Sequence, residues 1–486
     1  MRLGRAQLTL AGVLLAVAGV SEAADDWGGW RDRVTLTLSD RLRGELVDWF
    51  RPRAAPRGAG RYGFFASRLR AGVSVTLPHV QLVLQGQDTR LVNLPGDAVF
   101  PPPIGPLGPG ALYFLHTHQT TQGEPFLKLG FVTLRRSGLS VTGGRFEYAD
   151  GLETEPANPT LAFLKRYRLA ERLVGPFSYS HVSRSFDGGR VSYDRPDWNL
   201  TAMASRPTHG GFEVSANREI GDVGLAGLAL TLKRLPHAPP ADVRLFYLYY
   251  DDRRPSAVKV DNRPLAARRA DTDAIAVHSV GGHAATVIDA PPGAVDALLW
   301  GVVQAGKWGT LDHAAWAYAV EAGYQLPRLA WTPWLRAGYD RSSGDDDPTD
   351  RRHATFFQML PTARLYAQIP FFNLMNDSDL FAQLILAPHR RILVRADYHW
   401  LALTEPRDLW YAGSGATNDD VFGFSGAPSG GHRPLAHLAD VSVSVELGRQ
   451  LSLNAYYGHA FGQGVVRTTF AGADTDYGFV ELLLSL

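Results

Sequence analysis

Clustered arginines are the side chains with the clearest chemical potential in this sequence. Arg184 and Arg190 flank the stretch Ser185–Gly189, which ends in two glycines. Further basic residues lie just upstream, at Lys165, Arg166, Arg168 and Arg172. A guanidinium group holds a carboxylate through two parallel N–H bonds, a geometry that an ammonium group cannot match. The cluster therefore predicts contacts with anions, and with carboxylates above all.

The strength of such contacts favours transport. One exposed contact between an arginine and a carboxylate contributes about 1 kcal/mol or less. Several weak sites in series suit the passage of a solute, because the solute must leave as well as enter. A single tight site would instead suit a receptor or an enzyme.

The elements that position these residues are long segments of period-two alternation. Val441, Val443 and Val445 alternate with polar residues, and the same pattern recurs over 391–400 and 315–325. Such alternation is typical of strands with one apolar face. The segments run to about 10 residues, which is long for a soluble strand but right for a tilted membrane strand.

Connections of two lengths separate these segments. The short ones are predicted at Pro78-His79, Ser137-Gly138, Arg195-Pro196, Gly221-Asp222, Ala290–Gly293, Leu326-Pro327, Pro388-His389 and Gly448-Arg449. The longer ones are predicted near 50–61, 91–125, 149–183, 206–218, 253–272, 306–311, 341–377, 403–437 and 461–475. A soluble sandwich has no reason to alternate loop length in this way. The pattern predicts an all-β fold, a transmembrane antiparallel up-and-down barrel of about 18 strands with its long connections outside the cell.

The N-terminus is typical of a secretory signal. Arg2 and Arg5 are followed by the short apolar run Leu8–Val20 and by small residues around Ala23. The run is too short to anchor the chain, because spanning takes about 20 residues. We therefore expect a signal peptide at 1–23 and one barrel domain at 24–486, located in the cell outer membrane. The chain ends on Leu486, whereas outer-membrane proteins commonly end on an aromatic residue.

Composition and motifs exclude several function classes. A net charge of +1 argues against a nucleic-acid binder, and the absence of cysteine excludes thiolate chemistry. Ser414 lacks the spacing of a nucleophile elbow. The acidic run Asp345–Asp347 lacks the pattern of a calcium loop, and His116 with His118 has no evident third metal ligand. No catalytic residue, metal or cofactor is predicted, so the chain is not expected to be an enzyme.

If the apolar faces contact lipid, the charged residues on the other faces line the lumen. The basic ones include Arg41, Arg43, Arg68, Arg70, Lys128, Arg145 and Arg190, and the acidic ones include Glu45, Glu147, Glu321 and Asp340. The candidate pore-lining residues are Arg145, Glu147, Arg184, Asp187, Arg190, Arg336 and Arg395. The alternative is that these charges pair with one another in the wall and bind no solute.

Several motifs together resemble the alginate-export family of outer-membrane barrels. They are Gly144–Glu147, Arg172–Pro176, Arg184–Arg190, Asp251–Arg254, Ser343–Pro348 and Phe371–Asn373. The resemblance covers most of the mature chain. It implies an 18-stranded barrel whose arginine-rich constriction passes an anionic uronate polymer, with Arg145, Arg184 and Arg190 as pore residues.

These observations predict a channel for an anionic solute, in the first place export of an alginate-type uronate polysaccharide. The alternatives are a general anion-preferring porin for small nutrients and a secreted β-rich enzyme that acts on polysaccharide. Expected partners are an anionic polysaccharide or organic anion, outer-membrane lipid and periplasmic export proteins, with no nucleic acid.

Overall fold

The computed structural model describes residues 33–53, 58–362 and 367–486. The signal peptide expected at 1–23 lies outside the described residues.

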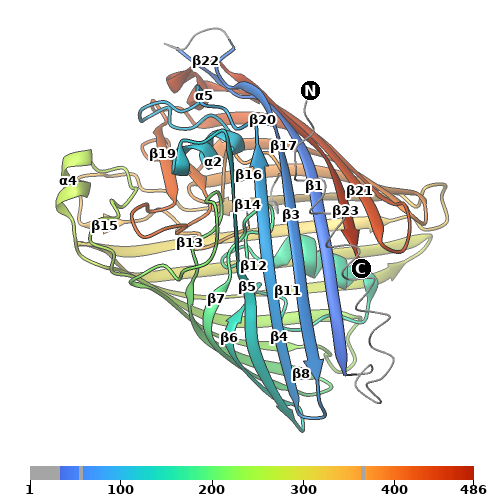
Figure 1. Ribbon diagram of the computed structural model, residues 1–486. Coiled ribbons are helices and arrows are strands. Elements are labelled where there is room, and N and C mark those ends of the chain that lie inside the picture. The colour runs from blue at the N-terminus through green and yellow to red at the C-terminus, as the bar shows by residue number, and fades with distance from the viewer. Residues whose placement is uncertain (1–32, 54–57, 363–366) are drawn as a thin grey trace, which may run out of the picture.

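Eighteen antiparallel strands form a closed barrel, because the first strand pairs with both the second and the last (Figure 1). In order around the wall they are β1 (Val34–Asp48), β3 (Arg61–Thr76), β4 (Val80–Val92), β5 (Thr121–Arg136), β6 (Leu139–Phe146), β7 (Phe186–Asp194), β8 (Trp198–Pro207), β9 (Val223–Leu232), β10 (Ala241–Asp252), β11 (Ile275–Ala290), β12 (Gly293–Trp308), β13 (Leu311–Gln325), β14 (Trp334–Ser342), β16 (Asp377–His389), β17 (Ile392–Leu403), β20 (Pro434–Glu446), β21 (Leu451–Gly462) and β23 (Asp474–Ser485). The predicted fold class and strand number are confirmed.

The remaining elements of the described residues belong to connections that leave the wall at one end of the barrel (Figure 1). The short strands are β2 (Arg51–Pro52), which pairs with β22 (Phe470–Gly472), β15 (Arg352–His353), which pairs with β13, and β18 (Leu409–Gly413), which pairs with β19 (Phe424–Pro428). The helices in the described ranges are α2 (Pro109–Thr117), α3 (Pro159–Leu164), the π-helix η2 (Lys165–Leu169), α4 (Leu265–Ala270) and α5 (Gly464–Thr469). No helix in the described part of the chain is long and apolar enough to cross a membrane.

The wall has an apolar outer face. On β12 the side chains of Leu299 and Val303 are exposed, whereas those of Leu298 and Trp300 are buried against the interior. Exposed apolar side chains on alternate positions are what a bilayer requires, since a charge placed there costs roughly 2–4 kcal/mol at the membrane midplane. The predicted alternation is thus confirmed as the pattern of lipid-facing and lumen-facing positions.

One predicted turn is in the wrong place. Gly221-Asp222 is not a short turn between strands but the end of the long connection 208–222. The short connection that follows β9 spans 233–240 and contains three prolines. Asp222 has a positive φ of 60°, so its turn-like sequence reflects a real bend at the end of a loop. The predicted number of strands is still correct, because the connection 233–240 takes the place of the predicted turn at Gly221-Asp222.

The two ends of the barrel also differ less strictly in loop length than predicted. The connection between β12 and β13 is only Gly309-Thr310, although it lies at the end that carries the long loops. At the other end, the connections 233–240 and 326–333 are longer than tight turns. The remaining long connections all lie at one end.

We expect the end with the long connections to face the outside of the cell. Asp346 lies there and Gly448 lies at the opposite end, and both are exposed. Because the chain has no cysteine, single Asp346→Cys and Gly448→Cys variants are suitable for labelling intact cells with an impermeant thiol reagent. Only Asp346→Cys should be labelled. Labelling of Gly448→Cys alone would reverse the orientation.

Candidate functional site

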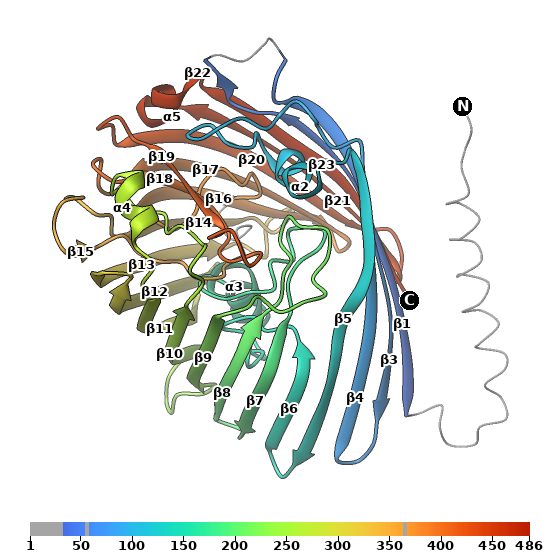
Figure 2. The same cartoon turned by 60° about the vertical axis from the view of Figure 1, so that its left-hand side comes forward.

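The long connection between β6 and β7, residues 147–185, folds into the barrel and is called the inward loop below. Its helix α3 lies inside the ring of strands (Figure 2). The helix begins locally, because the Asn158 side chain accepts hydrogen bonds from the backbone N–H groups of Thr160 and Leu161, and Pro159 occupies the first turn. The π-helix η2 continues α3 and carries the basic residues predicted from the sequence.

A buried ionic cluster ties the inward loop to the wall at β13 and β14. Glu321 of β13 accepts hydrogen bonds from Arg168 at 2.9 Å and from Arg172 at 3.0 Å. Arg336 of β14 donates to the same carboxylate at 3.1 Å, and Asp340 lies 3.3 Å from Arg172. These side chains are all at most 6% exposed. Glu321 therefore forms ion pairs with three buried guanidinium groups at once, and Asp340 and Asp296 supply further negative charge to two of them.

Other ion pairs fasten the loop to β10. The Lys165 ammonium lies 2.9 Å from Asp242, and Arg244 lies 2.6 Å from Asp150 and 2.7 Å from Glu153. Burial disfavours the charged ammonium more than Asp242 favours it, so the pKa of Lys165 is lowered. Lys165, Arg168 and Arg172 of the inward loop thus form ion pairs with carboxylates of the wall. Arg166 is the exception, because it is exposed and pairs with Glu155 at the surface.

A second group of cations lies on β1, β3 and β5. This basic row consists of Arg41, Arg43, Arg68, Arg70 and Lys128. Arg41 and Arg68 are cross-strand partners, so their side chains share the lumenal face. Arg43 pairs with Glu481 at 2.6 Å, and Lys128 pairs with Glu147 at 3.1 Å.

The basic row also binds the C-terminal part of the inward loop, residues 178–184. Arg41 donates to the backbone oxygens of Ser178 and Ser180, and Lys128 donates to that of Arg184. Burial raises the pKa of Glu147, but Lys128 and Arg70 outweigh that effect and lower it to about 2, so this carboxylate is charged at neutral pH.

The cations of the basic row outnumber its carboxylates. Glu45, Glu147 and Glu481 are the carboxylates within 4.0 Å of its five cations among the described residues. Arg68 forms no ion pair or side-chain hydrogen bond within the described part of the chain, and the Nε atoms of Arg41 and Arg68 are both buried without a hydrogen-bond partner there. Arg68 is therefore the guanidinium of this row that has no carboxylate partner among the described residues.

The structure turns two predicted pore residues outward. Arg145 and Asp187 are cross-strand partners that pair at 2.6 Å, and their neighbours Phe146 and Phe186 are buried in the interior. Because side chains alternate along a strand, Arg145 and Asp187 lie on the outer face of the wall. The sequence pattern failed here because loops fill the barrel at this level with an apolar core, so that the apolar side chains point inward.

The other predicted residues lie inside the barrel, in different surroundings. Arg184 is buried and donates to the backbone oxygen of Ser414 at 2.7 Å. Arg336 is buried in the Glu321 cluster. Arg190 is half-buried beside the ring of Phe146, and Arg395 pairs with Asp397 at 3.0 Å. The structure brings Glu147 into the basic row but does not gather the predicted set into one ring.

The histidines and the acidic run that were weighed as metal ligands have other partners. His116 lies in helix α2 and His118 directly after it, and His116 approaches Glu213 at 3.7 Å. Asp345 is buried and accepts backbone hydrogen bonds from Asp347 and Ala354. No group of three His, Asp or Glu side chains in the described residues is arranged to hold a metal ion.

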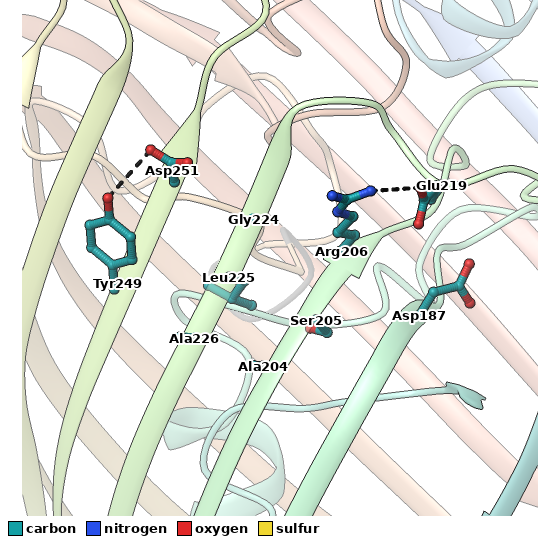
Figure 3. Close-up of a pocket in the computed structure, with 10 residues that line it drawn as sticks. All are labelled: Asp187, Ala204, Ser205, Arg206, Glu219, Gly224, Leu225, Ala226, Tyr249 and Asp251. Carbon is teal, nitrogen blue, oxygen red and sulfur yellow. Dashed lines mark hydrogen bonds and ion pairs between the residues drawn. The ribbon is translucent and has the colours of Figure 1, made fainter. Parts of the chain in front are cut away.

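A groove of about 620 Å³ lies on the outer face near the long-loop end, across β7 to β10 (Figure 3). Arg206 and Glu219 border it and pair at 2.8 Å, and small residues such as Ala204 and Ala226 form its floor. Its position on the outer face separates it from the lumen.

Comparisons with known proteins agree with this architecture. A sequence model described as "Alginate export" matches residues 130–476. Solved structures similar to this chain include OccK9 (OpdG) of Pseudomonas aeruginosa, with a TM-score of 0.57 and 12% identity, covering 94% of this chain and 99% of that one. OccAB2 of Acinetobacter baumannii has a TM-score of 0.58 and 11% identity over 94% and 99% of the two chains. No curated protein sequence matches. This chain belongs to the alginate-export family and is a channel protein of the cell outer membrane.

Proposed function

We propose that this channel passes carboxylate-bearing anions along the basic row, and that its cargo is an exported uronate chain. The observation that carries the proposal is Arg68, which faces the lumen without an ion-pair partner among the described residues. Arg41 and Arg70 lie on the same face, so a carboxylate that leaves Arg68 meets another cation. We assign no catalytic step to the chain.

Burial makes these contacts stronger than they would be in water. Coulomb energy scales inversely with the effective dielectric constant, which falls from about 80 in water to about 20 near a protein interior. The carboxylates of Glu147 and Glu481 limit this gain, because they share the row's positive charge. The result is a path of moderate sites, which allows a solute to leave as well as enter.

A polymer and a small solute differ in how binding depends on length. Each added uronate engages a further cation at high effective concentration, so oligouronates should block ion current more strongly as they lengthen. Neutral oligosaccharides of equal size should block little. The measurement is the concentration for half-maximal block in planar bilayers. Equal block by neutral and charged sugars would contradict the proposal.

A porin for small organic acids is the second candidate. The observation that favours it is the filling of the barrel, since the inward loop and the connections 343–376 and 404–433 pack an apolar core that includes Phe177, Phe357, Leu360 and Phe424. A filled barrel leaves a narrow path. Block by uronates that does not change beyond one or two sugar units would select this candidate.

A further inference from the structure

The connection between β17 and β20, residues 404–433, reaches across the mouth of the barrel. It contains the β18–β19 hairpin, and its tip spans 414–423. Around the barrel, β17 stands eight strands from β8 in one direction and ten in the other, so the loop after β8 belongs to the opposite side. The tip nevertheless contacts that loop, and Figure 2 shows the hairpin lying over the interior.

Three separate elements hold the tip in place. Arg184 of the inward loop donates to the backbone oxygen of Ser414 at 2.7 Å. Arg254, in the connection after β10, donates to the backbone oxygens of Asn418 and Val421 at 2.6 and 2.8 Å. These bonds use backbone acceptors of the tip, so they depend on its position more than on its side chains.

An ionic contact completes the fastening. His209, in the loop after β8, lies with Nε2 3.2 Å from Asp419 Oδ2 and with Nδ1 2.9 Å from Glu213 Oε2. Asp419 also accepts a hydrogen bond from the backbone N–H of Gly221 at 2.9 Å. An imidazole donates from both nitrogens only when it is protonated, so this arrangement stabilises the cationic ring.

We propose that residues 404–433 form a gate strap that closes the outer mouth and opens when its tip is released at the His209–Asp419 contact. This inference rests on the proposed channel function, because the open state is read as conductance. The ends of the strap continue into wall strands, and its tip is held both by these polar contacts, which solvent can replace, and by the packing of Ala416 and Phe422 in the apolar core.

Alkaline pH should weaken the contact. Burial disfavours the charged ring, but the hydrogen bonds and charges of Glu213 and Asp419 outweigh burial and raise the pKa of His209 above its usual 6.5. The protonated ring therefore stabilises the closed strap fully when the pH is below the usual pKa of histidine. This stabilisation is lost as the pH rises through the raised pKa of His209. Other charged groups nearby are His116, which faces Glu213, and Arg218 and Arg254, whose charges interact with that of Asp419. The pKa of His116 is lowered, chiefly by burial, so this ring loses its proton at a lower pH than His209 does.

A disulfide across the contact tests the gate directly. A Cβ atom at Gly211, in the loop after β8, would lie 3.7 Å from the Cβ atom of Thr417, within the range that disulfides use. The Gly211→Cys, Thr417→Cys pair would be the only cysteines in the chain. Oxidation should form the bond and lower the conductance, and a reductant should restore it. A bond that forms without changing a measurable conductance, or that fails to form, would overturn the inference.

The left-handed backbone of Gly211 strains any side chain placed there, so a second variant keeps the test independent of that pair. His209→Gln should raise the open fraction at about pH 6 roughly tenfold, the equivalent of one charge-assisted hydrogen bond, and should remove the rise expected as the pH increases above the usual pKa of histidine. His278→Gln is the control, because His278 bonds Tyr247 on the outer face, away from the strap. An unchanged pH response in His209→Gln would contradict the gate.

Failure of the channel function would look different. If the unmodified protein conducts no ions under any condition, the proposed function fails, but the strap can still be tested by thiol labelling. A single Thr417→Cys should react roughly tenfold faster when His209→Gln is added, because the tip is released more often. Equal labelling rates with and without His209→Gln would overturn the strap itself.

Discussion

Replacing Glu321 with alanine is expected to detach the inward loop from β13 and to raise the single-channel conductance. The carboxylate forms ion pairs with Arg168, Arg172 and Arg336, all of which are buried. Removing one partner of a buried ion pair costs about 3–5 kcal/mol, because the remaining charge is left unpaired. The undocked population should therefore rise more than about a hundredfold. Single-channel recordings and limited proteolysis within the inward loop measure it.

Arg166→Ala is the matched control for this variant. Arg166 lies on the π-helix η2, as Arg168 does, but it pairs with Glu155 at the surface, where an ion pair contributes about 0–1 kcal/mol. It should leave conductance and protease resistance unchanged. Equal behaviour of Glu321→Ala and Arg166→Ala would mean that the ionic cluster does not hold the loop.

The double variant Arg41→Ser, Arg68→Ser should abolish anion preference. The basic row has five cations and three carboxylates, a net charge of +2, and the variant has three of each, a net charge of zero. The reversal potential in a salt gradient should move toward that of an unselective pore, and block by oligouronates should weaken. Arg41 also bonds the inward loop, so Arg68→Ser alone is the cleaner, smaller change.

Arg145→Ser provides the control for selectivity. Arg145 was a predicted pore residue, but its side chain lies on the outer face with Asp187. Its removal should leave the reversal potential unchanged. A larger shift from Arg145→Ser than from Arg68→Ser would place the selective cation elsewhere and contradict the assignment of the basic row.

The sequence predicted what is local. Strand alternation and the turn chemistry at Ser137-Gly138 and Gly448-Arg449 depend on neighbouring residues, and these elements appear where expected. The docking of the inward loop depends on pairs far apart in the chain, such as Arg172 with Glu321, which are separated by 149 residues. No local pattern shows that such charges neutralise one another and are therefore withdrawn from the solute.

The predicted orientation of Arg145 was wrong for a related reason. Around it, Gly143, Gly144, Gly188 and Gly189 carry no side chain, so the pattern does not show which face is apolar. The nearest apolar residues, Phe146 and Phe186, pack on the loops inside the barrel and not on lipid. Alternation gives two faces, but which face contacts lipid depends on what fills the lumen. Arg68, in contrast, follows a clear alternation along β3, which identified it as lumenal.

The reversal potential of the unmodified protein in a planar bilayer tests the central claim most directly. With potassium chloride at unequal concentrations on the two sides, the basic row predicts a reversal potential with the sign of the chloride equilibrium potential. The preference should shrink as salt rises toward 1 M, where the Debye length is about 3 Å. A reversal potential with the sign of the potassium equilibrium potential, or an anion preference that does not change with salt concentration, would contradict an anion channel governed by these arginines.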